Sequence, residues 1–352
     1  MSVSDIIESL RAGRSLDAAG IEAAAACLLD TDADVARKAA LLMALSAKGE
    51  TPAEIAGFVK VFLRHAVRPP LDLTTLGRPA VDVCGTGGDK LSLFNISTAS
   101  MFILAGGGVA VVKHGNRGIT SPSGSADVLE ALGVPVNLAP ERFAECVSAH
   151  GAGFMLAPQY HPAFKAVAPV RAQLAKEGVR TIFNLIGPLL NPLQPPAQIV
   201  GVYDPALPPV YAEIFRQLGR RSAWAVHGDV PGASGMDEVS TLGTTHIVAL
   251  LDGTITEMTE RVPLPAPALD ELKGGDAPTN AAIITGILSG DLKGAKRDIV
   301  LANAAAGFRV TGMADGWESG LRLANESLDS GRALAVLHHL RAFSEALSLI
   351  HI

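Results

Sequence analysis

The sequence predicts an α/β protein in which a small, all-helical N-terminal domain precedes a larger domain with a mainly parallel central sheet flanked by helices. Three observations support this. Helix-type patterns fill residues 1–66, β-type and helix-type runs alternate from Ala80 onward, and most of the β-type runs are apolar almost throughout. Strands that are apolar on both faces belong to a sheet covered on both faces, which is the usual setting of parallel strands.

The N-terminal helices are expected from their capping residues. Ser4 and Asp32 are candidate N-caps of a first and a third helix, and Ser15 precedes a second, Ala-rich one. The third helix should cover 35–48 and end at Gly49, and Thr51-Pro-Ala-Glu54 has the form of a capping box that starts a fourth. Such short helices bury little surface alone, so a second copy of the chain is one candidate partner for them.

Residues 67–79 contain three prolines and a glycine and are expected to form a linker to an α/β domain over 80–352. Expected strands are 80–84, 109–112, 153–156, 199–203 and 222–226, and expected helices are 97–105, 126–132, 140–150 and 208–218. Residues 163–190 interrupt the alternation with a helical stretch. Asp252-Gly253 predicts a hairpin between 247–251 and 254–258, and a helical pattern returns from Thr279.

The composition describes a globular protein rather than a disordered one. Hydrophobic residues make up 48% and charged residues 18% of the 352, and the net charge of −6 argues against a nucleic-acid partner bound by bulk charge. Cys27, Cys84 and Cys146 lie far apart in apolar runs, so we expect buried free thiols and a reducing compartment. Because no signal-peptide pattern and no membrane-spanning run is seen, we expect a cytoplasmic protein.

Two Gly-rich loops each follow a β-type run and lead into a helix-type run. The first is Gly85-Thr-Gly-Gly-Asp89 and the second begins at Lys113-His-Gly-Asn-Arg117. Backbone N–H groups of such loops, together with a helix N-terminus, form a site for an anion, and Lys113 and Arg117 supply positive charge. Asp89 is an unusual neighbour for a phosphate unless a cation lies between them. Neither loop fits the P-loop or the dinucleotide fingerprint.

Several other residues have both a chemical and a structural interpretation. Asp237 and Glu238 are adjacent acids that could hold Mg²⁺, or they could form an exposed turn. Arg171 could pair with a planar carboxylate, or with an acid on the protein surface. His114, His161 and His227 are given structural roles. Helix capping is the simpler explanation for Asn95, Ser97 and Thr98, and no pattern for covalent catalysis is seen.

The combination of these motifs resembles the anthranilate phosphoribosyltransferases, members of the nucleoside-phosphorylase-like (type III) phosphoribosyltransferase family. The resemblance covers most of the chain and rests on these segments: 85–89, 95–98, 113–117, 123–133, 169–171, 180–192, 201–203 and 235–240. It implies transfer of a phosphoribosyl group from phosphoribosyl diphosphate to anthranilate in tryptophan biosynthesis, with Mg²⁺. It further implies that part of 163–190 joins the N-terminal helices, and it agrees with a homodimer formed through those helices.

By resemblance, the site residues fall into three sets. Phosphoribosyl diphosphate would contact Gly85, Gly88, Asp89, Asn95, Ile96, Ser97, Thr98, Lys113, His114, Gly115, Asn116, Arg117, Ser121 and Ser125. Anthranilate would contact Gly85, Asn116 and Arg171, and the metal ligands would be Ser97, Asp237 and Glu238. Lys113 and Arg171 would carry catalysis, the first by stabilising the leaving pyrophosphate and the second by aiming the acceptor.

The chain departs from the family pattern at the donor site. Lys90, Leu93, Gly118 and Pro122 stand where the family usually has Gly, Thr, Ala or Ser, and Lys. Leu93 lacks a hydroxyl for a phosphate, although Ser92 could substitute, so we predict weaker donor binding than in relatives. Two alternatives remain. One is a related transferase or pyrimidine-nucleoside phosphorylase with another acceptor, and the other is a non-catalytic paralogue that binds nucleic acid.

Overall fold

The computed structural model describes residues 2–118 and 122–349, with side chains described through Phe343. Its N-terminal part is helical, as expected. The helices are α1 (Val3–Arg11), α2 (Ala18–Leu29), α3 (Val35–Lys48) and α4 (Pro52–Arg64). The capping box at Thr51 and Glu54 is confirmed. The expected caps Ser4 and Asp32 are wrong, because the side chains of Ser2 and Asp34 accept the backbone N–H groups instead.

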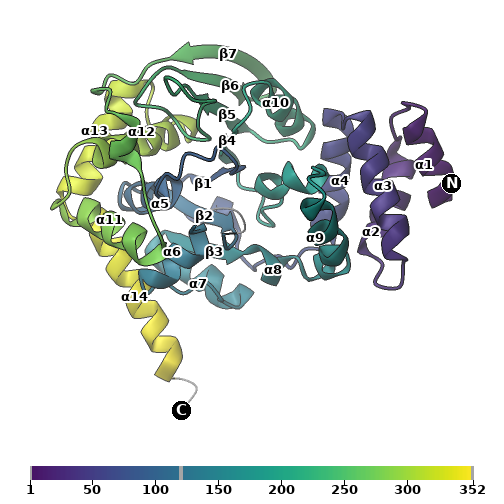
Figure 1. Ribbon diagram of the computed structural model, residues 1–352. Helices are drawn as coiled ribbons and strands as arrows, with labels where there is room; N and C mark the ends of the chain where they lie inside the picture. Colours follow the sequence, from purple (N-terminus) through teal and green to yellow (C-terminus); the bar gives the residue numbers. More distant parts are fainter. Residues whose placement is uncertain (1, 119–121, 350–352) are drawn as a thin grey trace.

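A seven-stranded sheet forms the centre of the described residues, and the expected mainly parallel arrangement is confirmed (Figure 1). Its order is β3-β2-β1-β4-β5-β6-β7, with parallel pairing from β3 to β5 and antiparallel pairing of β5 with β6 and of β6 with β7. The strands are β1 (Ala80–Gly85), β2 (Ala110–Gly115), β3 (Ala152–Leu156), β4 (Ala197–Gly201), β5 (Ser222–Gly228), β6 (Thr245–Leu251) and β7 (Thr254–Glu260).

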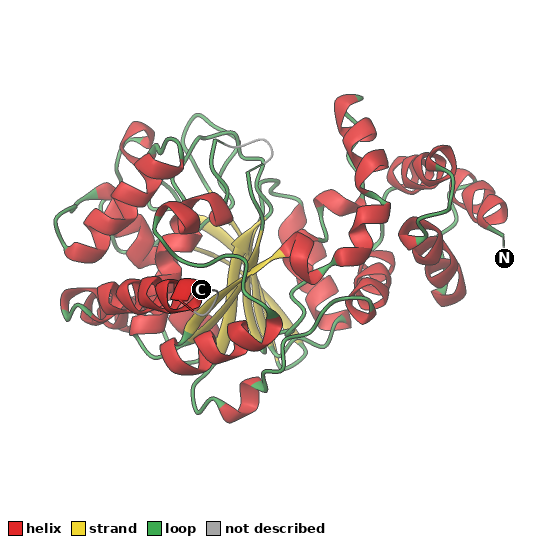
Figure 2. Ribbon diagram, turned by 90° about the horizontal axis from the view of Figure 1, so that it is seen from below, coloured by secondary structure: helices red, strands yellow, loops and turns green. Residues whose placement is uncertain are grey.

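Helices cover both faces of the sheet, which Figure 2 shows nearly edge-on. On one face α5 (Ile96–Gly106) packs against α12 (Ala295–Val310), α13 (Trp317–Asp329) and α14 (Arg332–Leu349). On the other face α10 (Leu207–Gln217) packs on β5 and β6 and against α4. The remaining α-helices are α6 (Ser125–Ala131), α7 (Pro140–His150), α8 (Ala157–Tyr160), α9 (Ala168–Lys176) and α11 (Ala277–Ser289).

Two apolar cores follow from this arrangement. One lies between the sheet and helices α5 and α11 to α14, and the other joins α1 to α4, residues of 167–190, α10 and the facing side of β4 and β5. The buried Lys38 on α3 ties the second core together, because its ammonium donates to the carbonyl of Ala166 at 2.7 Å. The segment 163–190 therefore packs on the N-terminal helices, while the domain boundaries at 66 and 80 stay a prediction.

The linker and the cysteines differ slightly from expectation. Residues 67–79 contain a short 3-10 turn, Leu73–Thr75. The three cysteines are free thiols; Cys27 and Cys146 are buried, but Cys84 is only partly so. Among the described residues, no helix has the length and apolar character required to cross a membrane.

Candidate active site

The strand order places one end of the sheet in a position to bind a ligand. From β1 the chain builds the sheet toward β2 and β3, and it then returns to add β4 and β5 on the other side of β1. The carboxyl ends of β1 and β4 lie side by side, with Gly85 opposite Gly201. Ligands of open α/β sheets bind at such a switch point. Both Gly-rich loops begin at this edge, because they follow β1 and β2.

The segment 235–240, which follows β5 and carries Asp237 and Glu238, folds back over this switch point and is called the acidic loop below. A Cβ atom at Gly85 would overlap the Asp237 carboxylate, and one at Gly201 would overlap the Asp237 carbonyl oxygen. Glycine is therefore required at both strand ends, because the acidic loop lies directly on them. The Gly87 N–H donates to Asp237 Oδ2 at 2.7 Å, which joins the acidic loop to the first Gly-rich loop.

The second acid, Glu238, lies beside the start of α5 and the ammonium of Lys113. Its Oε1 accepts a hydrogen bond from the Ser97 N–H at 3.2 Å. The Lys113 side chain is buried, and its Nζ donates to the Val83 carbonyl at 2.5 Å and to Ser97 Oγ at 3.2 Å. The structure thus brings together Ser97, Lys113, Asp237 and Glu238, all of which were predicted from the sequence.

The two acids perturb one another. Burial, together with the negative charge of Asp89, raises the pKa of Asp237 well above its ordinary value. Burial and the charge of Asp237 raise the pKa of Glu238 in the same direction, although Lys113 opposes the shift. Carboxylates crowded in this way are stabilised by a cation. In the part of the chain that the structure describes, no three His, Cys, Asp or Glu side chains are arranged to enclose a metal ion by themselves.

Sequence reasoning did not foresee the contacts that hold the acidic loop in place. Met236 and Gly228 exchange two backbone hydrogen bonds, of 2.8 and 3.0 Å. The buried Asn303 of α12 binds both backbone groups of Val239, at 2.9 and 3.0 Å. The His227 ring packs against Gly235, where a Cβ would overlap the imidazole. Only the glycine left a signal in the sequence; Asn303 lies in an ordinary helical pattern.

The first Gly-rich loop has a backbone that explains its composition in part. Gly87 and Gly88 have φ of 68° and 94°, which glycine adopts without strain. Lys90 and Ser92 also have positive φ, of 59° and 56°, and such conformations cost a non-glycine residue about 1 kcal/mol or more. The side chain of Leu93 is half-buried and packs against the core. Asp89 Oδ1 accepts from the Leu91 N–H at 3.1 Å.

The helix that follows this loop begins differently from the capping hypothesis. Asn95 is the N-cap of α5, but its side chain makes no capping hydrogen bond. Its Nδ2 donates instead to the Ser123 carbonyl at 3.2 Å. Ile96 and Thr98 are buried in the first turn of α5. The N–H groups of the first turn are therefore not capped by the Asn95 side chain, and that of Ser97 donates to Glu238 instead.

The second Gly-rich loop carries less free positive charge than the sequence suggested. The guanidinium of Arg117 pairs with both carboxylate oxygens of Glu130, each at 2.6 Å, and with Asp127 at 3.2 Å. Its charge is thus compensated on α6. Gly115 ends β2, where a Cβ would lie 2.9 Å from Ser125 Oγ. Asn116 accepts the Ala126 N–H through its carbonyl.

Ser121 lies outside the described residues. His114 is buried, with its ring at 5.2 Å from that of His161 in an edge-to-face arrangement. Burial and the neighbouring His161 lower the pKa of His114 to about 3. A neutral imidazole of such low basicity suits a structural role better than that of a general base near neutral pH.

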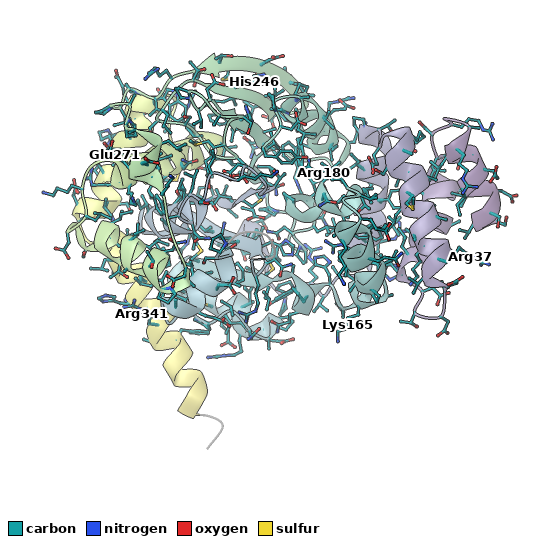
Figure 3. All side chains as sticks on the ribbon, viewed as in Figure 1. Arg37, Lys165, Arg180, His246, Glu271 and Arg341 are labelled. Atoms are coloured by element: carbon teal, nitrogen blue, oxygen red, sulfur yellow. The ribbon has the colours of Figure 1, made fainter. Side chains whose placement is uncertain are left out.

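Arg171 lies on α9, which packs against α3 as part of the second apolar core. Its guanidinium stacks over Phe183, with 4.8 Å between Cζ and the ring centroid, and burial lowers its pKa. No acid or carbonyl group among the described side chains and backbone pairs with it. Arg180 stacks similarly over Tyr203 at 4.4 Å, between the sheet and the N-terminal helices (Figure 3). Arg171 is therefore a partly buried cation that lies over an aromatic ring but has no anionic partner among the described residues.

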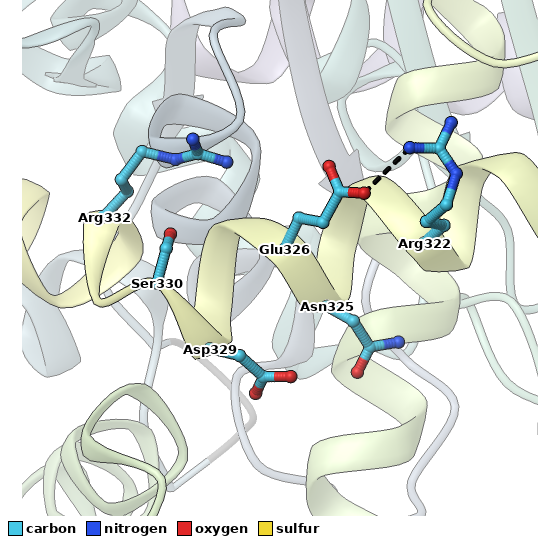
Figure 4. A pocket seen from close by; sticks show the side chains of 6 residues that line it. All are labelled: Arg322, Asn325, Glu326, Asp329, Ser330 and Arg332. Carbon is cyan, nitrogen blue, oxygen red and sulfur yellow. Dashed lines mark hydrogen bonds and ion pairs between the residues drawn. The ribbon is translucent and has the colours of Figure 1, made fainter.

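Two surface hollows are found among the described residues. One, of about 460 Å³, is formed by α13 and the start of α14 (Figure 4). Its lining residues are Arg322, Asn325, Glu326, Asp329, Ser330 and Arg332. Arg322 and Glu326 pair with each other, and Asp329 pairs with Arg297. The other hollow, of about 400 Å³, is bordered by the Asp229–Gly235 loop and Arg261. Neither contains the predicted site residues.

Comparisons with known proteins agree with this geometry. Residues 77–334 match the family described as the a/b domain of a glycosyl transferase family, and residues 4–66 match its helical bundle domain. The anthranilate phosphoribosyltransferase of Haloarcula marismortui is 43% identical over 96% of this chain and 98% of its own length. That of Moorella thermoacetica is 44% identical over 97% of this chain and 98% of its own length.

Solved structures give the same result. The crystal structure of anthranilate phosphoribosyltransferase from Thermus thermophilus has a TM-score of 0.87 and 38% identity, covering 97% of this chain and 99% of that one. The enzyme from Saccharomyces cerevisiae, in complex with PRPP and Mg, has a TM-score of 0.85 and 28% identity over 98% of each chain. With full-length similarity and a shared fold, the chain belongs to the anthranilate phosphoribosyltransferase family of glycosyl transferases.

Proposed function

We propose that this protein transfers the phosphoribosyl group of phosphoribosyl diphosphate to the amino nitrogen of anthranilate, giving N-(5-phosphoribosyl)anthranilate and pyrophosphate in tryptophan biosynthesis. The full-length similarity to enzymes of this name supports the reaction. The observation within the molecule that carries it is the convergence of Ser97, Lys113, Asp237 and Glu238 at the switch point of the sheet. A phosphorylase or a nucleic-acid-binding role has no comparable support.

The acid pair fits a magnesium ion. Asp237 and Glu238 lie beside each other with raised pKa values, so a divalent cation would relieve their repulsion. Mg²⁺ usually binds one or two carboxylates and takes its other ligands from water and substrate oxygens. We assign Ser97, Asp237 and Glu238 as its ligands. When bound, the ion would neutralise charge on the leaving pyrophosphate.

The chain's own groups stabilise the same charge. The Lys113 ammonium donates a hydrogen bond to Ser97 Oγ, and the N-terminus of α5 contributes its aligned peptide dipoles. Free N–H groups of the two Gly-rich loops would contact phosphate oxygens. This is electrostatic stabilisation that exists before the substrate arrives, and it requires no proton transfer by His114. We propose Gly85, Gly88, Asp89, Asn116 and Ser125 as further contacts of phosphoribosyl diphosphate.

Arg171 supplies the acceptor site. A planar guanidinium matches the carboxylate of anthranilate, and the Phe183 ring, 4.8 Å from the guanidinium carbon, restrains the position of that group. Held in this way by its carboxylate, the acceptor would have its neighbouring amino group aimed at the ribose. Positioning of this kind converts a bimolecular reaction into an effectively unimolecular one.

The assembly and cellular location belong to the same proposal. Val35 and Met43 on α3 are 42% and 46% exposed, which supports a homodimer through the N-terminal helices. Size-exclusion chromatography with light scattering would show a mass of about two chains, and a Met43→Glu variant should shift it toward one. A biosynthetic enzyme of this class is expected in the cytoplasm.

The reaction is tested by mixing anthranilate, phosphoribosyl diphosphate and the protein with and without Mg²⁺. Loss of anthranilate fluorescence that requires the metal, together with the product mass, would support the proposal. Donor binding by calorimetry without turnover would point to a different acceptor. Absence of both would overturn it.

A further inference from the structure

A chain segment that the sequence motifs do not include, residues 273–280, lies against the end of the first Gly-rich loop. Lys273 forms an antiparallel bridge with Leu93, and the Gly274 N–H donates to the Ser92 carbonyl at 2.9 Å. A Cβ at Gly274 would lie 2.6 Å from Phe94 Cα and 2.7 Å from Phe94 N. Two backbones thus run in direct contact, and only glycine permits this spacing.

Asn280, in the helix that this segment enters, connects it to both Gly-rich loops. The residue is 1% exposed. Its Nδ2 donates to Asn95 Oδ1 at 2.9 Å and to the Gly275 carbonyl at 3.2 Å, and its Oδ1 accepts the Gly275 N–H at 2.8 Å. Asn95 in turn donates to the Ser123 carbonyl at 3.2 Å. The chain of hydrogen bonds therefore runs from α11 through the start of α5 to the loop before α6.

The direction of this chain is fixed by its two ends. The Ser123 carbonyl can only accept, so Asn95 must present its NH₂ group there and its oxygen toward Asn280. The Gly275 N–H can only donate, so Asn280 must turn its oxygen to Gly275 and its NH₂ group to Asn95. Neither amide can be reversed without facing two acceptors or two donors. A buried network that is satisfied in one orientation alone specifies a single geometry.

We propose that Asn280 is a positioning residue for the phosphoribosyl diphosphate site, which sets the separation of the two Gly-rich loops through Asn95. The inference rests on the proposed function for the identity of the ligand. Asn280 does not reach the site itself; it acts through the residue at the start of α5 and through Ser123. The close contact at Gly274 holds the segment that carries it against the first loop.

The test replaces one atom. Asn280→Asp has nearly the same shape but loses both donors and places a carboxylate against the oxygens of Asn95 and Gly275. If the Asn95 amide rotates so that its NH₂ group faces the new carboxylate, its oxygen then faces the Ser123 carbonyl, and neither of these oxygens can donate. We expect the KM and the calorimetric Kd for phosphoribosyl diphosphate to rise about 10-fold or more, because buried unmatched polar groups are costly. The KM for anthranilate and the kcat at saturating donor should change less than about 2-fold.

The matched control is Asn325→Asp on α13. Asn325 is a half-buried asparagine that is likewise hydrogen-bonded; it donates to the Leu321 carbonyl and accepts from Arg297, outside the site loops. It should leave both KM values unchanged. Asn280→Ala removes the side-chain N–H groups without adding charge, and it covers the case in which the Asp variant fails to fold. We expect it to raise the Kd for phosphoribosyl diphosphate about 3-fold. A purely structural role would instead lower the active fraction and leave the donor Kd of the folded protein unaltered.

A double-variant cycle tests the relay. In an Asn95→Ala background, Asn280→Asp should add little to the loss of donor affinity, whereas independent effects would multiply and overturn the proposal. Equal increases in both KM values, or an unchanged donor Kd, would also overturn it. If the natural protein binds the donor but does not consume anthranilate, the proposed acceptor fails and the donor Kd still decides the role of Asn280. Failure of the natural protein to bind the donor would remove both.

Discussion

Removal of the Arg171 guanidinium should separate acceptor binding from donor binding. The group is partly buried, stacks on Phe183, and has no acid partner among the described residues. A charge-assisted, two-point contact with a carboxylate at such a site contributes about 2 to 3 kcal/mol. Arg171→Ala should therefore raise the KM for anthranilate about 30- to 150-fold, at about 1.4 kcal/mol per factor of ten. The KM for phosphoribosyl diphosphate should change less than about 2-fold.

Two further variants sharpen this experiment. Arg171→Lys keeps the charge but loses the planar fork, so an intermediate KM for anthranilate is expected. Lys176→Ala removes one positive charge from the exposed side of the same helix and should change neither KM. Initial rates would be followed by anthranilate fluorescence over a grid of both substrate concentrations. Equal increases in the two KM values, or a similar effect from Lys176→Ala, would refute the role assigned to Arg171.

Three other predictions concern the donor loop, pH and stability. Leu93→Thr should lower the KM for phosphoribosyl diphosphate about 3- to 10-fold, because it supplies a hydroxyl whose hydrogen bond a phosphate can accept. The control Leu91→Thr should leave this KM unchanged. An unchanged KM in Leu93→Thr would count against the prediction that Leu93 weakens donor binding. Burial lowers the pKa of His161 from 6.5 to about 4. Below pH 6.5 the unfolded chain binds a proton at this histidine and the folded chain does not. The contribution of the neutral His161 to the free energy of unfolding is therefore fully present above pH 6.5 and is lost as the pH falls toward 4. Urea unfolding would measure the free energy of unfolding at pH 7.5 and at pH 5.0. The decrease between the two should be about 2 kcal/mol larger in the natural protein than in His161→Asn, and equal decreases would exclude this role. The buried Glu54 carboxylate pairs with Lys48 at 2.7 Å and accepts the Leu16 N–H at 2.9 Å. Glu54→Ala should therefore reduce the free energy of unfolding by about 3 kcal/mol, and Glu54→Gln should reduce it by less. A loss below about 1 kcal/mol in Glu54→Ala would contradict this role.

Much of the fold could be predicted because its signals are local. The strands and the Asp252-Gly253 hairpin follow from apolar runs and turn residues, and the helix Pro140–His150 agrees with its expected bounds. The caps of α1 and α3 were misplaced because each lies in a run with competing candidates, Ser2 with Ser4 and Asp32 with Asp34. Which side chain reaches the free N–H groups is decided by backbone geometry, which the residue type alone does not specify.

The site was only partly predictable for a similar reason. Motifs located Ser97, Lys113, Asp237 and Glu238, but not what surrounds them. Arg117 looked like a free cation, yet Asp127 and Glu130 compensate it on the next helix. The contact of Asn280 with Asn95 joins positions 185 residues apart. Such contacts arise from the topology of the chain, and no local pattern encodes them.

The most direct test of the account measures pyrophosphate release and anthranilate consumption in the same reaction. The two should occur in equal amounts, require Mg²⁺ and phosphoribosyl diphosphate together, and be lost in an Asp237→Asn, Glu238→Gln variant that remains folded. Such coupling would show that the acidic loop and the acceptor site act on one bond. Pyrophosphate release without anthranilate consumption, or full activity in that variant, would contradict the account.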